Sequence, residues 1–301
     1  MADVSPQGTS RRRHAVSLLA LGRRVAEHGE LGEELRQETA RLLQRTVARA
    51  RQDGAQRLGL VGTEALRRAQ DCPLLVDQVQ QMAHLRLRVL TGELEARLSY
   101  LGGTAFRVAT GQGATLADIG GGSTEVVQGT GTRPAGGVSL RLGSDRILQA
   151  TGADDPPSPR QRADAALRIS MTLEAAPEPR RGDLLIATGG TAANLPVLLD
   201  RWDALPDSSE ALFEEGEREP WLSLSRDGVK RALGFTARHP AAEVARRTGL
   251  SPERARLMAG GTMVLWGLME HYRAESLLVT EHGLRDGVLL RLAAAPARSP
   301  A

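Results

Sequence analysis

The stretch Asp118-Ile119-Gly120-Gly121-Gly122-Ser123-Thr124-Glu125 lies between the segments Thr115-Leu116-Ala117 and Val126-Val127. Apolar residues on both sides of three consecutive glycines predict two short strands joined by a tight hairpin turn. Because glycine has no Cβ, the N–H groups of such a turn can approach a phosphate closely. The carboxylates of Asp118 and Glu125 stand at the two ends of the turn, where a divalent cation can join protein and phosphate oxygens. The stretch therefore predicts a phosphate site.

Two better-known glycine loops do not fit this spacing. A dinucleotide fingerprint needs a glycine three residues after Gly122, where Glu125 stands. A Walker A loop needs a lysine after its last glycine, and the only lysine of the chain is Lys230. An ordinary glycine-rich hairpin without a ligand is the remaining alternative, and the acidic residues at both ends of the turn argue against it.

Length and composition are those of a soluble globular protein. A chain of 301 residues with 41% hydrophobic and 25% charged residues can bury a real core and most naturally forms two domains. The single cysteine, Cys72, excludes an internal disulfide and suits the cytoplasm. No apolar run reaches the roughly 18 residues of a membrane span, so we expect no membrane association.

Arginine dominates the basic residues. Of 39 basic residues one is lysine, and arginine forks bind phosphate groups bidentately, which suits a polyanionic substrate. The alternative is codon bias, because alanine, glycine and proline are abundant as well. A net charge of +3 without aromatic residues between the basic ones gives no reason to expect nucleic-acid binding.

Hydrophobic periodicity divides the chain into strands alternating with helices, the pattern of an α/β protein. We expect a disordered tail over residues 1–13, a first domain over residues 14–113 and a second domain over residues 114–301. Within the first domain the pattern predicts a strand in 14–25, a helix over 32–53 and a helix over 72–82 with Asp71 as its cap. The acidic segment 207–219 is predicted to be a surface excursion.

The glycine octet resembles the second phosphate loop of the exopolyphosphatase and guanosine pentaphosphate phosphohydrolase family, which belongs to the actin-like ATPase superfamily. Other segments resemble further motifs of that family in the same order along the chain. The resemblance implies an α/β fold of two actin-like (ribonuclease H-like) domains, each with a mixed sheet flanked by helices. The similar segments are Val61–Arg67, Thr91–Gly102, Ala187–Ala192, Leu250–Ala255 and Gly283–Gly287.

The resemblance also implies a reaction and its residues. Terminal phosphate would be removed from inorganic polyphosphate or guanosine pentaphosphate by water, with Glu95 as general base and with Mg²⁺ held by Asp118 and Glu125. Leu94 departs from the family pattern, which has a second glutamate at that position. The residues implied to bind phosphate are Arg67, Gly120, Gly121, Gly122, Ser123, Gly189, Gly190 and Thr191.

Each of these residues also has a structural interpretation. Without the resemblance, Glu95 is a solvated helix charge paired with Arg97 or Arg88. Arg67 is then a surface arginine of a helix. The glycines of Gly189-Gly190-Thr191 then serve only close packing, rather than presenting a helix N-terminus to an anion.

One motif of the family is missing. Members begin with a first phosphate loop of the type Asp-Ile-Gly-Ser/Thr-Asn-Ser, and residues 1–13 contain nothing similar. We therefore expect the first domain to be truncated at its N-terminus, and the DNA before Met1 to encode the missing hairpin. If the hairpin is absent, a sensor that binds phosphate or a nucleotide without turnover is the alternative to an enzyme.

Two further expectations concern substrate and assembly. The sequence leaves polyphosphate and guanosine pentaphosphate open, whereas a sugar or acetate kinase of the same superfamily is disfavoured by the order of the motifs. We expect a homodimer, on the basis of the resemblance and of the apolar run Met258–Leu268.

Overall fold

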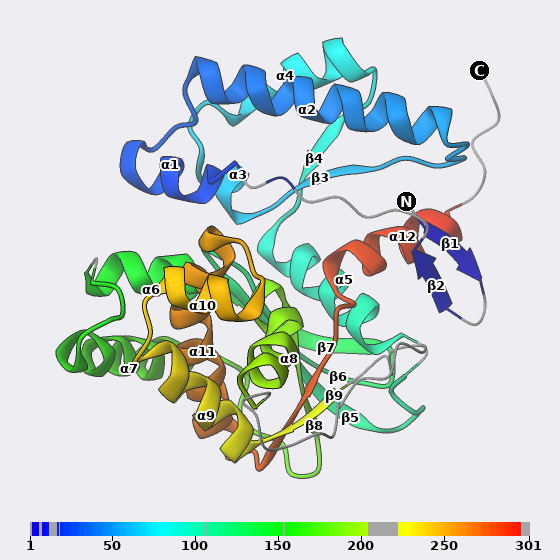
Figure 1. Cartoon of the computed structure of the whole chain (residues 1–301). Helices are drawn as coiled ribbons and strands as arrows, with labels where there is room; N and C mark the ends of the chain where they lie inside the picture. The colour runs from blue at the N-terminus through cyan, green and yellow to red at the C-terminus, as the bar shows by residue number, and fades with distance from the viewer. Residues whose placement is uncertain are drawn as a thin grey trace.

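The computed structural model describes residues 2–5, 8–11, 17, 19–105, 107–152, 154–203 and 222–295. In this part of the chain strands and helices alternate, and a mixed sheet is flanked by helices on both faces, which confirms the expected α/β class (Figure 1). Two parts can be distinguished. We call residues 21–89 the helical lobe and residues 92–294 the sheet lobe.

The sheet lobe is built on a six-stranded sheet with the strand order β7-β6-β5-β8-β10-β9. Strands β5, β8 and β10 run parallel, while β6, β7 and β9 pair antiparallel to their neighbours. The central strands β5 and β6 are largely buried on both faces, so their sequences do not alternate regularly between apolar and polar residues. The strands are β5 (Gly113–Ile119), β6 (Thr124–Thr130), β7 (Arg133–Leu140), β8 (Leu184–Gly189), β9 (Leu222–Ser225) and β10 (Ser276–Val279).

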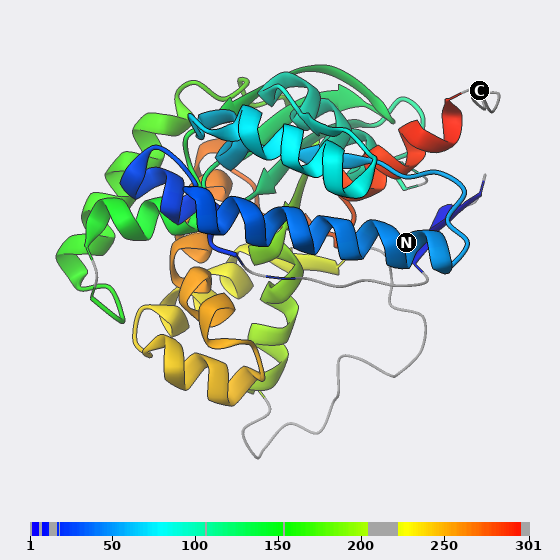
Figure 2. The ribbon, with the colours of Figure 1, turned by 90° about the horizontal axis from the view of Figure 1, so that it is seen from above.

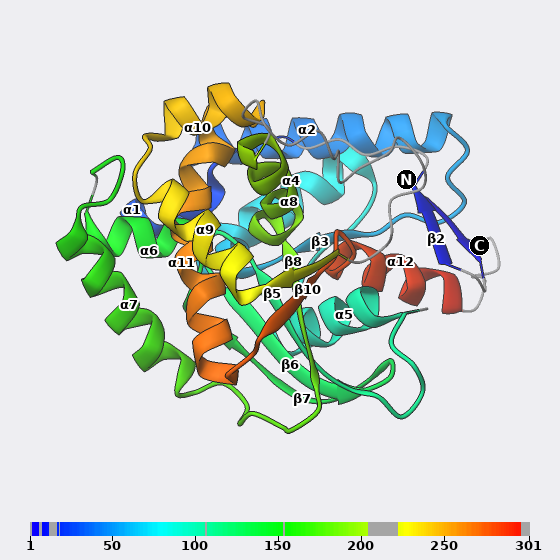
Figure 3. The same ribbon diagram turned by 60° about the horizontal axis from the view of Figure 1, so that its bottom comes forward.

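Six helices cover one face of this sheet (Figure 3). The longest, α11, runs through their middle and places Met258, Leu265 and Leu268 in the core, fully buried. Most of the run Met258–Leu268 therefore packs within this chain, and of its residues Ala259, Trp266 and Gly267 are partly exposed. The six helices are α6 (Ser144–Thr151), α7 (Pro159–Leu173), α8 (Gly190–Asp203), α9 (Arg226–Thr236), α10 (Ala241–Thr248) and α11 (Pro252–Tyr272).

Two helices, α5 (Gly92–Thr104) and α12 (Leu284–Ala294), lie on the opposite face (Figure 3). Their closest approach is made by glycines. A Cβ on Gly102 would overlap the carbonyl oxygen of Gly283, and a Cβ on Gly287 would overlap that of Leu98. Tyr100 of α5 is fully buried against the sheet. Among the described residues, no helix has the length together with the apolar character that a membrane span needs.

The helical lobe has its own hydrophobic core, which includes Val25, Leu31, Leu75 and Val79. Its two strands pair in parallel, and the long helix α2 lies across the lobe (Figure 2). Periodicity predicted α2 and α4, because each of these helices has one apolar face. The elements are α1 (Leu21–His28), α2 (Glu33–Gln52), β3 (Leu60–Gly62), α3 (Glu64–Arg68), α4 (Cys72–Ala83) and β4 (Leu87–Val89).

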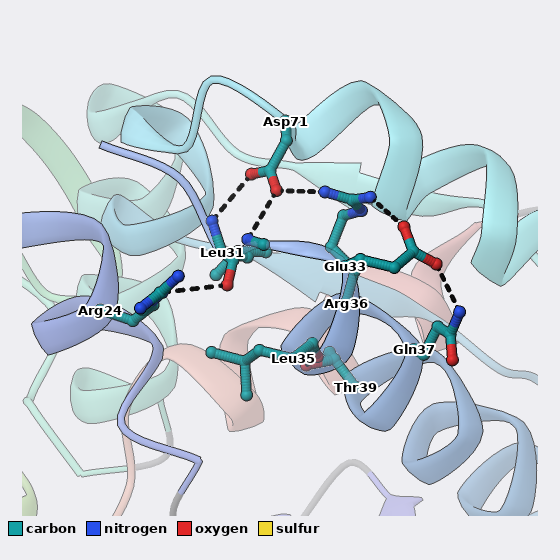
Figure 4. Close-up of polar contacts among 9 residues, drawn as sticks. Arg24, Leu31, Glu33, Leu35, Arg36, Gln37, Thr39 and Asp71 are labelled. Atoms are coloured by element: carbon teal, nitrogen blue, oxygen red, sulfur yellow. Dashed lines mark hydrogen bonds and ion pairs between the residues drawn. The ribbon is translucent and has the colours of Figure 1, made fainter. Parts of the chain in front are cut away.

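Asp71 precedes α4, as expected, but its side chain does not cap that helix. Its carboxylate instead accepts the backbone N–H groups of Leu31 and Gly32, each at 2.9 Å, and an ion pair from Arg36 (Figure 4). Arg36 is also paired with Glu33. The carboxylate thus ties the turn between α1 and α2 to the start of α4, a long-range role that local sequence does not reveal.

Other expectations need correction near the N-terminus. The strand predicted in residues 14–25 is wrong where the structure describes it, because Leu21–His28 is helical. The disordered tail is wrong for Ala2–Ser5 (β1) and Gly8–Arg11 (β2), which pair as an antiparallel hairpin. The predicted excursion over 207–219 lies outside the described residues, and the domain boundary after residue 113 stays a prediction.

Candidate active site

A row of polar side chains crosses one face of the sheet. Strand register places Glu125 directly opposite both Ser139 on β7 and Asp118 on β5, and it places Asp118 opposite Thr188 on β8. Residues directly opposite each other on neighbouring strands point to the same face. The two carboxylates that the sequence places at the ends of the glycine turn therefore lie side by side.

The carboxylate of Asp118 accepts hydrogen bonds from both helices on this face of the sheet, α5 and α12. The Ser99 hydroxyl on α5 donates to Asp118 Oδ2 at 2.6 Å, and the first N–H of α12, that of Leu284, donates to the same carboxylate. Burial raises the pKa of Asp118, although these two hydrogen bonds and the charge of Arg285 oppose the rise. The side chain is thus fixed in orientation within a region where a negative charge is costly.

Glu125 is 2% exposed and accepts a hydrogen bond of 2.6 Å from the Ser139 hydroxyl. Burial and, to a smaller extent, the charges of Glu95 and Asp118 raise the pKa of Glu125 to about 8, although a hydrogen bond from Ser139 opposes the rise. A carboxylate with this pKa takes up a proton near neutral pH unless a cation compensates its charge.

Glu95 stands in the first turn of α5 and is 5% exposed. Arg67 of α3 forms an ion pair with its carboxylate and also donates to the Leu90 carbonyl at 2.9 Å. Burial raises the pKa of Glu95, and Arg67 opposes the rise. The interpretation of Glu95 as a solvated charge is therefore wrong. Arg97, one partner suggested for it, pairs with Glu93 instead.

The glycine turn is held through its carbonyl groups. The N–H of Ser144 donates to the Gly120 carbonyl at 3.0 Å, and the next two N–H groups of α6 donate to that of Gly121 at 3.0 and 3.1 Å. In a trans peptide the N–H points away from the carbonyl. The N–H groups of Gly121, Gly122 and Ser123 therefore face away from α6, and none of them donates a hydrogen bond to the backbone of the described residues. Together they can cradle an anion.

Gly189 lies beside Asp118, as a phosphate site would require. It has φ +93°, and a Cβ at this position would overlap the Ile119 carbonyl and lie 2.9 Å from Asp118 Oδ1. Gly190 is the first residue of α8 and lies against the guanidinium of Arg254. Thr191 packs its side chain against Gly261 of α11, so its hydroxyl group serves close packing.

The profile of the Ppx/GppA phosphatase family matches residues 2–295 of this sequence. Exopolyphosphatase 1 of Mycobacterium leprae is 31% identical over 246 residues, which cover 79% of this chain and 68% of that protein. The chain belongs to the Ppx/GppA phosphatase family. A guanosine-5'-triphosphate,3'-diphosphate pyrophosphatase of Photobacterium profundum is 25% identical over 272 residues, which cover 87% of this chain and half of that protein.

Solved structures of the Ppx/GppA family have the same fold. The PPX-GPPA enzyme of Aquifex aeolicus superimposes with a TM-score of 0.78 at 25% sequence identity, covering 96% of this chain and 93% of that one. The resemblance inferred from the motifs is thereby confirmed, together with the actin-like fold.

A hard divalent cation fits the donor set of this Ppx/GppA site. Asp118 and Glu125 offer adjacent carboxylate oxygens, and the charge of Asp118 raises the pKa of both Glu95 and Glu125, which marks a region of negative potential. No group of three His, Cys, Asp or Glu side chains within the described ranges could hold a metal alone. Two carboxylates suffice for Mg²⁺, whose remaining ligands are commonly waters and substrate phosphates.

Sequence reasoning missed the residues that hold the site from other elements. Ser99, Ser139 and Arg146 donate hydrogen bonds to candidate residues, and Glu64 holds Arg146 by an ion pair. Each contact joins segments at least 14 residues apart. Local motifs carry no signal for such pairs, which depend on strand register and on the packing of the two lobes.

Proposed function

We propose that this protein is a hydrolase that releases terminal phosphate from inorganic polyphosphate or guanosine pentaphosphate, with Glu95 as general base. The observation that carries the proposal is the convergence of three carboxylates, those of Glu95 and Glu125 buried and that of Asp118 half-buried, on a turn whose N–H groups make no backbone hydrogen bond. A phosphoryl group needs charge neutralisation, and its attacking water needs orientation.

In this proposal each group has one task. The N–H groups of Gly121, Gly122 and Ser123 bind oxygens of the terminal phosphate. Glu95 orients a water and takes its proton, and its raised pKa brings it closer to the working pH of a base. Arg67 fixes the Glu95 carboxylate and presents the rest of its guanidinium to the phosphate.

Asp118 and Glu125 would hold Mg²⁺, which supplies positive charge to the phosphate oxygens when bound. Ser99 and the start of α12 orient Asp118 for this, and Ser139 orients Glu125. The names of relatives support the substrate class, since they include an exopolyphosphatase and a guanosine-5'-triphosphate,3'-diphosphate pyrophosphatase.

The test is phosphate release from long-chain polyphosphate and from guanosine pentaphosphate, with and without Mg²⁺. Glu95→Gln should lower kcat by about 10²–10⁴-fold. Glu93→Gln is the matched control, because Glu93 lies on the same helix but is exposed and paired with Arg97. It should leave the rate unchanged. Equal rates for the two variants would remove Glu95 from the role of base.

A sensor without turnover is the second candidate. The ion pair between Glu95 and Arg67 favours it, because a carboxylate neutralised by a guanidinium is a weaker base. Such a protein would bind polyphosphate or guanosine pentaphosphate and release no phosphate. Turnover that disappears in Asp118→Asn would exclude this candidate.

We also propose a cytoplasmic location and no nucleic-acid partner. The single cysteine, Cys72, is buried and suits a reducing compartment. Fractionation of the native cells followed by detection of the protein tests the location.

A further inference from the structure

The third carbonyl of the glycine turn is held differently from the first two. The Gly120 and Gly121 carbonyls accept backbone N–H groups of α6, which no substitution of a side chain removes. The Gly122 carbonyl accepts the Nε–H of Arg146 at 2.7 Å. Since this peptide also carries the N–H of Ser123, Arg146 decides where that N–H points.

Arg146 is in turn held by the other lobe. Its Nη2 donates to Glu64 Oε1 at 2.9 Å, and Glu64 opens α3 of the helical lobe whereas Arg146 lies on α6 of the sheet lobe. Glu64 also fills the space beside the turn, because a Cβ on Gly122 would overlap its Oε2. The Glu64–Arg146 pair therefore joins the two lobes at the last glycine of the turn.

Resting on the proposed function, we propose that Arg146 and Glu64 are positioning residues that aim the Ser123 N–H at the substrate phosphate. The relative position of the two lobes thereby sets the geometry of the turn. The Glu64–Arg146 ion pair forms only when α3 and α6 lie close enough for the two side chains to meet. Neither side chain needs to touch the substrate. A misplaced donor at this site should weaken phosphate binding by about 10–100-fold, as loss of outer-shell partners commonly does.

Arg68 provides a matched control. It donates to the same Glu64 oxygen at 3.0 Å and lines the same pocket of about 140 Å³ beside the turn, but it has no hydrogen bond to Gly122 among the described contacts. Arg68→Gln and Arg146→Gln thus each remove one ion pair to Glu64. Only the second removes the donor to the turn.

The experiment follows the Ser123 backbone N–H by NMR while inorganic phosphate is added, and measures the Kd of tripolyphosphate by calorimetry in the Glu95→Gln background. In the wild type and in Arg68→Gln the Ser123 N–H should shift downfield with phosphate. In Arg146→Gln the shift should be lost and the Kd should rise at least about 10-fold. Arg146→Lys keeps the charge without the Nε donor and should behave like Arg146→Gln.

Three results overturn the inference: no Ser123 shift in the wild type, equal behaviour of the Arg146 and Arg68 variants, or full binding by Arg146→Lys. If Arg146→Gln does not fold, Glu64→Gln is the deciding variant. It removes the ion pair that holds Arg146 without changing a residue of the turn, and it should also raise the Kd of tripolyphosphate. Phosphate release by the unmodified protein is measured separately. A failure of the proposed hydrolysis is therefore distinguishable from a failure of this inference.

Discussion

At the scale of single residues, the site concentrates negative charge where water is excluded. Asp118 and Glu125 face each other across two strands, and Glu95 approaches them from α5. Burial raises the pKa of all three carboxylates. Such an arrangement is unfavourable in the empty protein and becomes favourable when a cation and a phosphate are bound.

Glu125 should make the stability of the metal-free protein depend on pH. Its pKa of about 8 lies above the unfolded value of about 4.3, so the native state holds more protons between these two limits. The free energy of unfolding should therefore fall as the pH rises from about 4.3 to 8. Glu125→Gln should remove part of this slope and be more stable than the wild type at pH 8, as measured by urea unfolding without Mg²⁺.

Asp71 has the opposite pH dependence. Burial alone would raise its pKa, but hydrogen bonds from Leu31, Arg36 and Gly32 outweigh it and lower the pKa. Its stabilising contribution is complete above the unfolded value of about 3.9 and is lost as the pH falls through the folded value. Asp71→Ala should lower the free energy of unfolding at pH 7 by about 3 kcal/mol, because Arg36 is left buried without this partner. A loss below about 1 kcal/mol would contradict this role.

At the scale of elements, the crossing of α5 and α12 brings two helix starts to the sheet. Glycines at the crossing let the backbones meet, so that the Leu284 N–H reaches Asp118 while Glu95 stands at the start of α5. The carboxylates of the site thus depend on how closely two helices pack, as well as on their own strands.

Gly287→Ala should separate these helices. Its Cβ would overlap the backbone of Leu98, which cannot move aside as a flexible side chain could. We expect a loss of about 1–3 kcal/mol in the free energy of unfolding and a weaker affinity for Mg²⁺. Gly22→Ala on α1 is the control, since a Cβ there meets no atom within 4 Å and alanine favours a helix. If both variants lost equal stability, the crossing would not be the cause.

At the scale of the whole molecule, the site lies where the two lobes meet. The helical lobe contributes Arg67 and Glu64, and the sheet lobe contributes Glu95, Asp118 and the glycine turn. Each lobe has its own hydrophobic core, and contacts between the lobes include the Glu64–Arg146 and Arg67–Glu95 ion pairs.

A ligand that bridges the lobes should stabilise the whole chain. Tripolyphosphate with Mg²⁺ at about 100 times the Kd should add about 2.7 kcal/mol to the free energy of unfolding. Tripolyphosphate alone or Mg²⁺ alone should add less to the free energy of unfolding. Without the cation, the carboxylates of the site and the phosphate groups repel each other. Differential scanning fluorimetry measures the effect. An equal rise of Tm in Asp118→Asn would show that binding occurs elsewhere.

The homodimer stays a prediction of the sequence, although most of the run Met258–Leu268 that suggested it is buried within this chain. Light scattering over a range of concentrations tests it. A constant mass near the 32.2 kDa of one chain would contradict a dimer.

The sequence by itself determined the family, the α/β class and most helices, because these depend on local patterns. Glycine spacing and the order of motifs identified the turn, and apolar periodicity located α2 and α4. The sequence also placed Asp118 opposite Glu125, since a tight hairpin fixes the register of its two strands.

Only the tertiary structure decided which distant groups hold the site. Ser99, Ser139 and Arg146 reach their partners through helix packing and strand register, and Asp71 bonds to a turn 39 residues away rather than capping its own helix. These contacts join segments whose mutual position depends on the whole core. No local pattern encodes such a position, because it results from the sum of many weak packing interactions over both lobes.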